Sequence, residues 1–152
     1  MSNPDWAVPL GQSMSSSEES KNQTQLKSIA PQFAVPDVIA AAEYYREILG
    51  FRILGYFGQP PAFSIVGRDN VEIQLGKVDR NAGPAQNSVQ REDGLDAYVW
   101  VTDVDSLYAE LKERGANIIE PPKHRVYHCY EMVVEDRFGF RLAFAMDYPN
   151  PA

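Results

Sequence analysis

Val35-Pro36-Asp37-Val38 and Val101-Thr102-Asp103-Val104 are two copies of one pattern, 66 residues apart. Each copy closes a short apolar run and opens a segment whose apolar residues recur at helical spacing. An aspartate at such a junction is a good helix N-cap, because its carboxylate accepts hydrogen bonds from the free N–H groups of the first turn. The chain therefore contains an internal repeat, and each copy places one helix after one strand.

Both copies continue with the same signals. Gly50 and Gly115 stand where the two helical patterns stop, as glycine does after many helices. Short runs of strand-forming residues follow each helix and are separated by turn residues, among which we count Pro121-Pro122 as a break. We expect strands at Phe51–Phe57, Ala62–Val66, Val71–Leu75, Ala116–Ile119, Tyr130–Glu135 and Phe140–Met146. Each half therefore predicts the order strand–helix–strand–strand–strand, an α+β architecture.

The repeat divides the chain into segments. The first is rich in Ser, Gln and Asn, and we expect a disordered or loosely docked tail in which Trp6, Val8 and Leu10 are the apolar exception. A Gly-, Pro- and Asn-rich stretch separates the two units. We predict a tail at 1–27, a first βαβββ module at 28–76, a linker at 77–93, a second module at 94–147 and a C-terminal tail at 148–152.

Composition excludes several classes of protein. With 14 basic and 21 acidic residues the net charge is −7, which disfavours a nucleic-acid partner and favours a cationic ligand. No apolar stretch is long enough to cross a bilayer, and the N-terminus has no apolar secretion signal. A single cysteine, Cys129, suits a reducing compartment. We expect a cytoplasmic protein without a membrane partner.

Further residues carry a family resemblance. Glu43-Tyr44-Tyr45-Arg46-Glu47-Ile48-Leu49-Gly50-Phe51 is similar to a helix end of the vicinal-oxygen-chelate superfamily, which contains glyoxalase I, extradiol dioxygenases and bleomycin-resistance proteins. Asp96–Asp105 and Glu135–Arg141 support it, the latter where the family usually has Asp-Pro-x-Gly. The resemblance covers Ile29 to Asp147. It implies two βαβββ modules that form a curved, half-open mixed sheet around a cavity, with helices on the outer face.

The resemblance also implies where a metal would lie. Family enzymes hold one divalent ion with four side chains, and these positions fall on Ala30, Gln74, Asp96 and Ala143. Alanine has no side-chain donor, so two positions cannot bind an ion. We expect no catalytic metal and no other cofactor. If a divalent metal ion were present, Gln74 and Asp96 would hold it.

Strand alternation predicts what faces the cavity. If the four family positions point inward, so do the residues two places away on each strand. The predicted lining is Gln32, Glu72, Gln74, Asp96, Tyr98, Trp100 and Arg141. Aromatic rings beside carboxylates suit flat, cationic ligands. The alternative is that Tyr98 and Trp100 fill the space and close the cavity.

Lys123–Tyr130 holds both histidines and the only thiol. We interpret this segment as a lip over the cavity whose Tyr127, His128 and Tyr130 touch the ligand. A Cys129–His128 nucleophile and base is disfavoured, because neighbouring residues on a strand point to opposite faces. A metal pair of His124 with His128 would need a helix, which the nearby prolines disfavour. Cys129 is then a buried thiol.

Together these inferences predict a small-molecule binding protein rather than an enzyme. Its bleomycin-resistance-like relatives imply a homodimer that sequesters a cationic or aromatic antibiotic or metabolite without a metal. Pairing of the modules within one chain or between two chains stays open. The alternatives are a metal-dependent lyase or dioxygenase with Gln32 or Glu72 as a third ligand, a metal-free acid–base catalyst using Asp96, Glu72 or Tyr98, and an interaction module that acts through Trp6.

Overall fold

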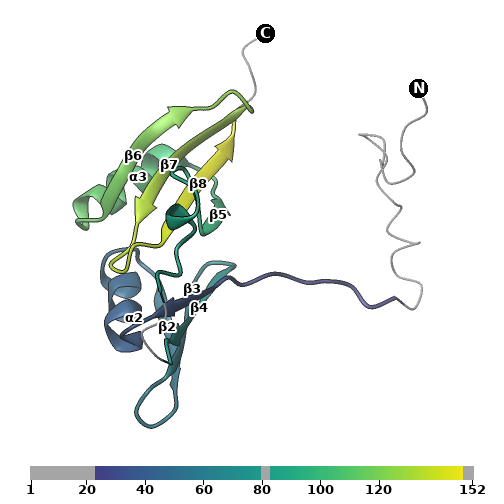
Figure 1. Ribbon diagram of the computed structural model, residues 1–152. Coiled ribbons are helices and arrows are strands. Elements are labelled where there is room, and N and C mark those ends of the chain that lie inside the picture. The colour runs from purple at the N-terminus through teal and green to yellow at the C-terminus, as the bar shows by residue number, and fades with distance from the viewer. Residues whose placement is uncertain (1–22, 80–82, 149–152) are drawn as a thin grey trace.

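The first module follows the predicted order. A computed structural model describes residues 23–79 and 83–148, so most of the predicted N-terminal tail lies outside the described residues (Figure 1). Its elements are β1 (Gln32–Val35), α2 (Val38–Glu47), β2 (Arg52–Phe57), β3 (Phe63–Arg68) and β4 (Val71–Lys77). They form a sheet of order β1-β4-β3-β2, in which β1 and β4 are parallel and the other pairs antiparallel.

The second module repeats this topology. After a short 3-10 turn, η1 (Asn87–Val89), come β5 (Ala97–Trp100), α3 (Val104–Glu113), β6 (Asn117–His124), β7 (Cys129–Glu135) and β8 (Arg141–Asp147). The sheet order is β5-β8-β7-β6, again with its first pair parallel. The predicted α+β fold of two βαβββ modules is confirmed.

Local signals at the helix ends act as expected. The carboxylates of Asp37 and Asp103 accept hydrogen bonds from the N–H groups of Ala40 and Ser106, at 3.0 and 3.1 Å. Gly50 and Gly115 have φ of +74° and +86°, a conformation that glycine adopts without steric cost. The sequence thus sets the start and the end of both helices locally.

One predicted break is absent. Strand β6 continues through Pro121-Pro122 to His124, and its register with β7 shifts between Glu120 and Lys123. Backbone N–H positions of consecutive strand residues point to opposite sides, so edge position accommodates only one of the two prolines. The other is accommodated by the register shift, within which neither proline pairs with a residue of β7. The turn between β6 and β7 therefore shrinks to residues 125–128.

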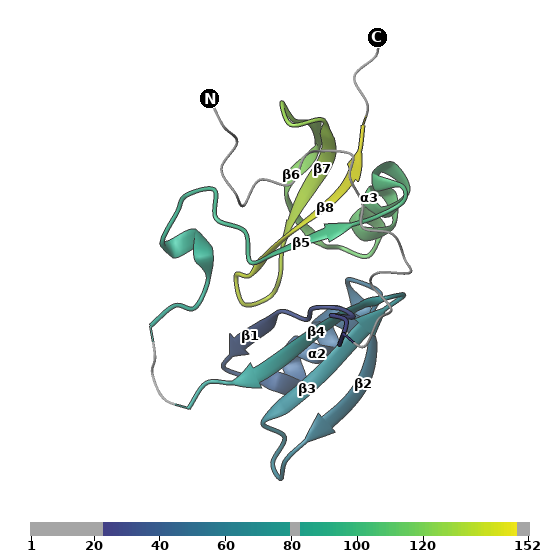
Figure 2. The same ribbon diagram turned by 90° about the vertical axis from the view of Figure 1, so that its right-hand side faces the viewer.

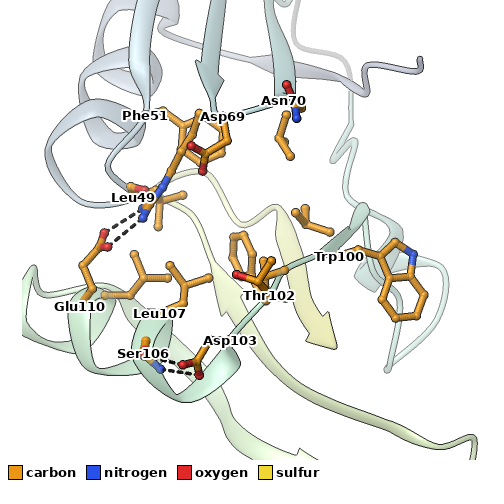
Figure 3. Close-up of a pocket in the computed structure, with 16 residues that line it drawn as sticks. Leu49, Phe51, Asp69, Asn70, Trp100, Thr102, Asp103, Ser106, Leu107 and Glu110 are labelled. Carbon is orange, nitrogen blue, oxygen red and sulfur yellow. Dashed lines mark hydrogen bonds and ion pairs between the residues drawn. The ribbon is translucent and has the colours of Figure 1, made fainter. Parts of the chain in front are cut away.

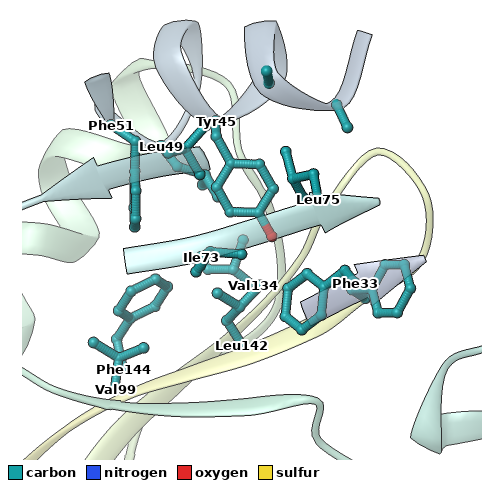
Figure 4. Packing of buried hydrophobic residues seen from close by; sticks show 14 of the residues in the cluster. Phe33, Tyr45, Leu49, Phe51, Ile73, Leu75, Val99, Val134, Leu142 and Phe144 are labelled. Atoms are coloured by element: carbon teal, nitrogen blue, oxygen red, sulfur yellow. The ribbon is translucent and has the colours of Figure 1, made fainter. Parts of the chain in front are cut away.

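The two modules share one core. Figure 4 shows Tyr45, Ile73 and Leu75 of the first module facing Val134 and Leu142 of the second. The rings of Phe33 and Phe140 stack with centroids 4.5 Å apart. Because neither module has much core of its own, packing one against the other buries apolar surface that each alone would expose.

The β7–β8 turn carries much of this contact. Figure 2 shows it reaching from the second module towards β1 and α2. There the Tyr45 hydroxyl donates a 2.8 Å hydrogen bond to the buried Asp136, whose other carboxylate oxygen accepts from the N–H groups of Phe138 and Phe140. Desolvation raises the pKa of Asp136, although these hydrogen bonds lower it.

Packing of the modules leaves one face of each sheet outside the core. We call it the open face. It carries Gln32 and Gln74 in the first module and Tyr98 and Trp100 in the second, while their strand neighbours Phe33 and Val99 are buried. None of the helices among the described residues has the length and apolar character that a membrane span requires.

Candidate functional site

A cleft of about 580 Å³ separates the modules, between the β3–β4 turn and α3 (Figure 3). Four of its polar side chains are engaged in pairs: Arg68 makes two hydrogen bonds to Glu110, at 2.7 and 2.8 Å, and Asp103 caps α3 through Ser106. The indole of Trp100 points away from these side chains in Figure 3. The cleft is therefore part of the contact between modules, and Arg68, Glu110, Asp103 and Ser106 are already paired within it.

The open face of the first module carries a chain of polar side chains. Gln32 Nε2 donates to Gln74 Oε1 at 2.6 Å, and Gln74 Nε2 donates to Glu72 Oε2 at 3.0 Å. Gln32 and Gln74 are direct partners on the parallel strands β1 and β4, which places their side chains on the same face. The structure thus brings three predicted lining residues together.

The open face of the second module is aromatic. Tyr98 and Trp100 lie edge to face with ring centroids 5.3 Å apart, and 38% and 58% of their surfaces are exposed. Their partners on β8 are Ala143 and Ala145, whose small side chains leave space over the sheet. The aromatic pair therefore stands free rather than filling a closed interior.

Asp96 and Arg141 have other partners. Asp96 precedes β5, and its two carboxylate oxygens accept hydrogen bonds from the N–H groups of Asn87 and Arg141, at 2.8 and 2.9 Å. The Arg141 side chain donates to Glu135 and to the carbonyl of Glu92. Asp96 thus fixes the linker against β8, while Arg141 borders a hollow over the second module.

The three residues predicted to touch the ligand from the β6–β7 segment do not lie on one face of the sheet. Tyr130 lies on the helix side of the sheet, where its hydroxyl donates to Asp105 at 2.6 Å and its ring stacks on His124. His128 occupies the turn with φ of +63°, its N–H bonded to the carbonyl of Arg125. Tyr127 turns the other way, onto the open face, where its hydroxyl donates to Glu131.

Glu131 is the residue that the sequence analysis missed. Its side chain is 1% exposed, although it lies at the floor of a hollow of about 1330 Å³ between the linker and the β6–β7 hairpin. Arg125 Nε lies 3.2 Å from its carboxylate and Arg125 Nη2 bonds to Glu120. A glutamate in the middle of the apolar run of β7 was the available signal, because strand alternation puts it on the open face with Val133.

Because these groups lie close together, they shift one another's pKa values. Burial raises the pKa of the Tyr98 hydroxyl, and contact with Cys129 and the charge of Glu131 raise it further. Burial and the hydrogen bond to Glu131 raise the pKa of Tyr127 to about 12. Both phenols thus stay neutral well above pH 7, and Tyr127 donates its hydrogen bond to Glu131.

The family positions for a divalent ion do not form a cage. Ala30 and Ala143 supply no donor atom, Asp96 is engaged by two backbone N–H groups, and Gln74 is bonded to its neighbours. Across residues 23–79 and 83–148, no three His, Cys, Asp or Glu side chains are grouped so that they could bind a metal.

Comparison with known proteins agrees with this architecture. The family model described as "Glyoxalase/Bleomycin resistance protein/Dioxygenase superfamily" matches residues 25–144. No match was found among curated proteins.

Solved structures show the same fold at low sequence identity. TioX from Micromonospora sp. ML1 is 17% identical, with a TM-score of 0.63 over 80% of this chain and 98% of that one. A bleomycin resistance determinant encoded on transposon Tn5 is 15% identical, with a TM-score of 0.64 over 80% and 98%. A glyoxalase-related enzyme from Clostridium phytofermentans is 14% identical, with a TM-score of 0.63 over 84% and 99%. At these identities the likeness is one of fold.

Proposed function

The chain belongs to the Glyoxalase/Bleomycin resistance protein/Dioxygenase superfamily, and on that premise we propose that it sequesters a small cationic or aromatic molecule without a catalytic metal. One observation carries the proposal: two exposed aromatic rings, Tyr98 and Trp100, stand on the same open face as the carboxylate of Glu131. The likeness to a bleomycin resistance determinant makes an antibiotic one candidate ligand, and a cytoplasmic metabolite is the other.

The composition of this face favours such a ligand. An exposed indole or phenol can stack on a flat ring without breaking contacts inside the protein. A cation over the face of such a side chain gains about 0.5–2 kcal/mol. Two alanines on β8 leave room beside the rings. The chain's net charge of −7 attracts a cation over longer distances.

The absence of donor atoms at Ala30 and Ala143 supports a metal-free binding mode. A Lewis-acid mechanism needs an ion held firmly while one coordination position stays open for the substrate. Gln74 and Asp96, whose two oxygens each accept one backbone hydrogen bond, are too few to hold an ion in this way. This chemistry favours a binding role over metal-dependent catalysis.

The ligand site is completed by a second copy of the chain. Each open face exposes large apolar side chains, among them Leu54 and Phe57 on the first module and Trp100 on the second. A twofold dimer would place the first module of one chain against the second module of its partner and cover both faces at once. Light scattering after gel filtration tests this, and a monomer at high micromolar concentration would contradict it.

Isothermal titration calorimetry tests the binding proposal. We expect heat and saturation with bleomycin or other cationic aromatics, and no binding by anionic aromatics of the same size. Expression in a sensitive bacterial host should raise tolerance to the drug that binds. If no member of a broad cationic aromatic panel binds, the proposal is wrong.

A second candidate function rests on the bonded set of Gln32, Gln74 and Glu72. These side chains carry oxygen donors of the kind that Mn²⁺ or Fe²⁺ binds, so a metal-dependent lyase or dioxygenase with an unusual ligand set is the alternative. Elemental analysis of the purified protein separates the two functions. One transition metal per chain that is lost in Gln74→Ala would favour the enzyme.

A further inference from the structure

Resting on the proposed function, we infer that Glu131 anchors a basic group of the ligand and that Arg125 of the β6–β7 turn occupies this carboxylate until the ligand displaces it. The argument begins with burial. Glu131 is 1% exposed, and a buried carboxylate is costly unless it is paired. Its pairing comes from the turn itself, through Arg125 and Tyr127.

Arg125 is an incomplete partner. Its Nε lies at ion-pair distance from Glu131 but, among the described residues, it is the buried side-chain polar atom left without a hydrogen bond. The same guanidinium also bonds to Glu120 through Nη2. Two carboxylates thus share one cation, and the more deeply buried of them has the poorer geometry. A ligand ammonium or guanidinium that points a donor at Glu131 improves on it.

The turn is built so that this exchange costs little. It spans only residues 125–128, its tip residue Val126 is 96% exposed, and Tyr127 is 55% exposed. Two backbone hydrogen bonds close it, from the N–H of Arg125 to Cys129 and from the N–H of His128 to Arg125. Moving Arg125 towards Glu120 leaves those backbone bonds intact and uncovers Glu131 to the hollow.

Strand register also sets the distance between the two groups that would bind the ligand, Trp100 and Glu131. Trp100, Ala145 and Glu131 are successive partners on the neighbouring strands β5, β8 and β7. Adjacent strands lie about 4.8 Å apart, so the indole and the carboxylate are anchored roughly 10 Å apart across the sheet. On the strand between them the partner residue is the small Ala145. The ring of Tyr98 contacts Trp100, and its hydroxyl lies close enough to Glu131 to feel that charge. The site therefore fits a flat ring over Trp100 joined by a short chain to a basic group at Glu131.

The test uses two probes that differ only in charge, naphthylethylamine and naphthylethanol, titrated into the full chain by calorimetry. Binding of the neutral alcohol tests the proposed aromatic site by itself. We expect the amine to bind about tenfold more tightly, as a hydrogen bond to a charged group allows. If the alcohol binds and the amine binds no better, the anchor is wrong while the binding function stands. If neither binds, the proposed anchor and ring site are wrong, and the cationic aromatic panel decides the binding function.

Two variants change the preference in opposite directions. Glu131→Gln keeps an acceptor oxygen for Tyr127 but removes the charge, so the amine should lose its advantage. Arg125→Gln removes the competing cation, so the amine should bind several-fold more tightly than to the unchanged chain. Glu113→Gln, an exposed site on α3, removes the same charge elsewhere and should leave both affinities unchanged.

If Arg125 and Glu131 only shaped the turn and did not bind the ligand, the variants would behave differently. Both Glu131→Gln and Arg125→Gln would then weaken the two probes alike, and this result would overturn the inference. Thermal unfolding followed by far-UV circular dichroism shows whether each variant folds. Should Glu131→Gln fail to fold, the Arg125→Gln result decides by itself, because tighter binding of the amine supports displacement and unchanged or weaker binding contradicts it.

Discussion

The two modules have the same backbone topology but carry different side chains on their open faces. Register makes their positions equivalent: the row Gln32, Gln74, Ile65 of the first corresponds to Tyr98, Ala143, Val133 of the second. In the next row Ala34, Gly76, Phe63 correspond to Trp100, Ala145, Glu131. Where the first module has amides and small residues at Gln32, Gln74, Ala34 and Gly76, the second thus has aromatic rings and alanines. Its carboxylate, Glu131, takes the position of Phe63. Helix caps and core residues therefore specify the module, while its open face is free to change.

The modules also differ in how each holds the other. The last hairpin of each reaches the partner module's helix. From the second module, Asp136 makes a buried hydrogen bond with Tyr45 of α2. From the first, Arg68 pairs with Glu110 of α3, and both side chains are about a third exposed. The positions are matched but the environments are not, and we expect the buried contact to contribute more to stability.

The largest effect should come from Asp136→Ala. This change removes the acceptor of three hydrogen bonds at the buried seam, so we expect the free energy of unfolding to fall by about 3 kcal/mol or more, measured by urea denaturation. Asp136→Asn is the matched control. Its amide oxygen still accepts the two backbone N–H groups and its NH₂ can donate to the Tyr45 hydroxyl, so most of the stability should remain.

Trp100→Ala should weaken binding of a cationic aromatic ligand by about tenfold, because stacking and cation–π contact are lost together. Gln74→Ala on the other open face should change the affinity by less than about threefold, which is the scale of one neutral hydrogen bond. Calorimetric titration of both variants compares the two faces directly. Equal losses would show that the two faces contribute equally to the site.

Arg68→Ala should lower the free energy of unfolding by about 1 kcal/mol, because the pair with Glu110 is bidentate but partly solvated. The exposed pair of Arg46 with Glu47 provides the control, and Arg46→Ala should be close to neutral. Both are measured by urea denaturation in low salt. A loss of stability from Arg68→Ala as large as that from Asp136→Ala would contradict the ranking of these two contacts between the modules.

The smallest effect concerns pH. Desolvation raises the pKa of Asp136 in the folded chain, so the folded state binds this proton more tightly than the unfolded state. The stabilisation that comes from binding this proton is therefore fully present below the pKa of the unfolded chain and is lost as pH rises through the higher folded pKa. It is separate from the stabilisation by the three hydrogen bonds that Asp136 accepts. Asp136→Asn should remove this slope. The check is a series of urea melts across that acidic range, in which an unchanged slope in the variant would assign it to another group.

Local signals account for what could be predicted. The N-caps at Asp37 and Asp103 and the positive-φ glycines after each helix act within a few residues, so they can be recognised without knowing the fold. The prolines of β6 predict a break when only neighbouring residues are considered. Whether a strand lies at the edge of a sheet depends on strand order, which a short stretch of sequence does not reveal.

Site residues were harder to place. Alternation correctly grouped Tyr98 with Trp100 because both lie within β5. Asp96 lies before the strand begins, where alternation no longer applies, and the linker supplies an N–H group to its carboxylate. Tyr130 was expected at the ligand, but alternation from the observed start of β7 turns it towards Asp105 of α3. Orientation thus followed strand boundaries that the sequence places only to within a few residues.

The chain's own residues were enough to determine the repeat, both helices and the superfamily, because these depend on interactions between near neighbours and on periodic burial. Tertiary structure alone decided that Glu131 lies beneath Arg125 and Tyr127, and that each module is held by the other's last hairpin. Contacts of this kind join atoms on different strands or modules, and a carboxylate's partner is set by which segments fold together in space.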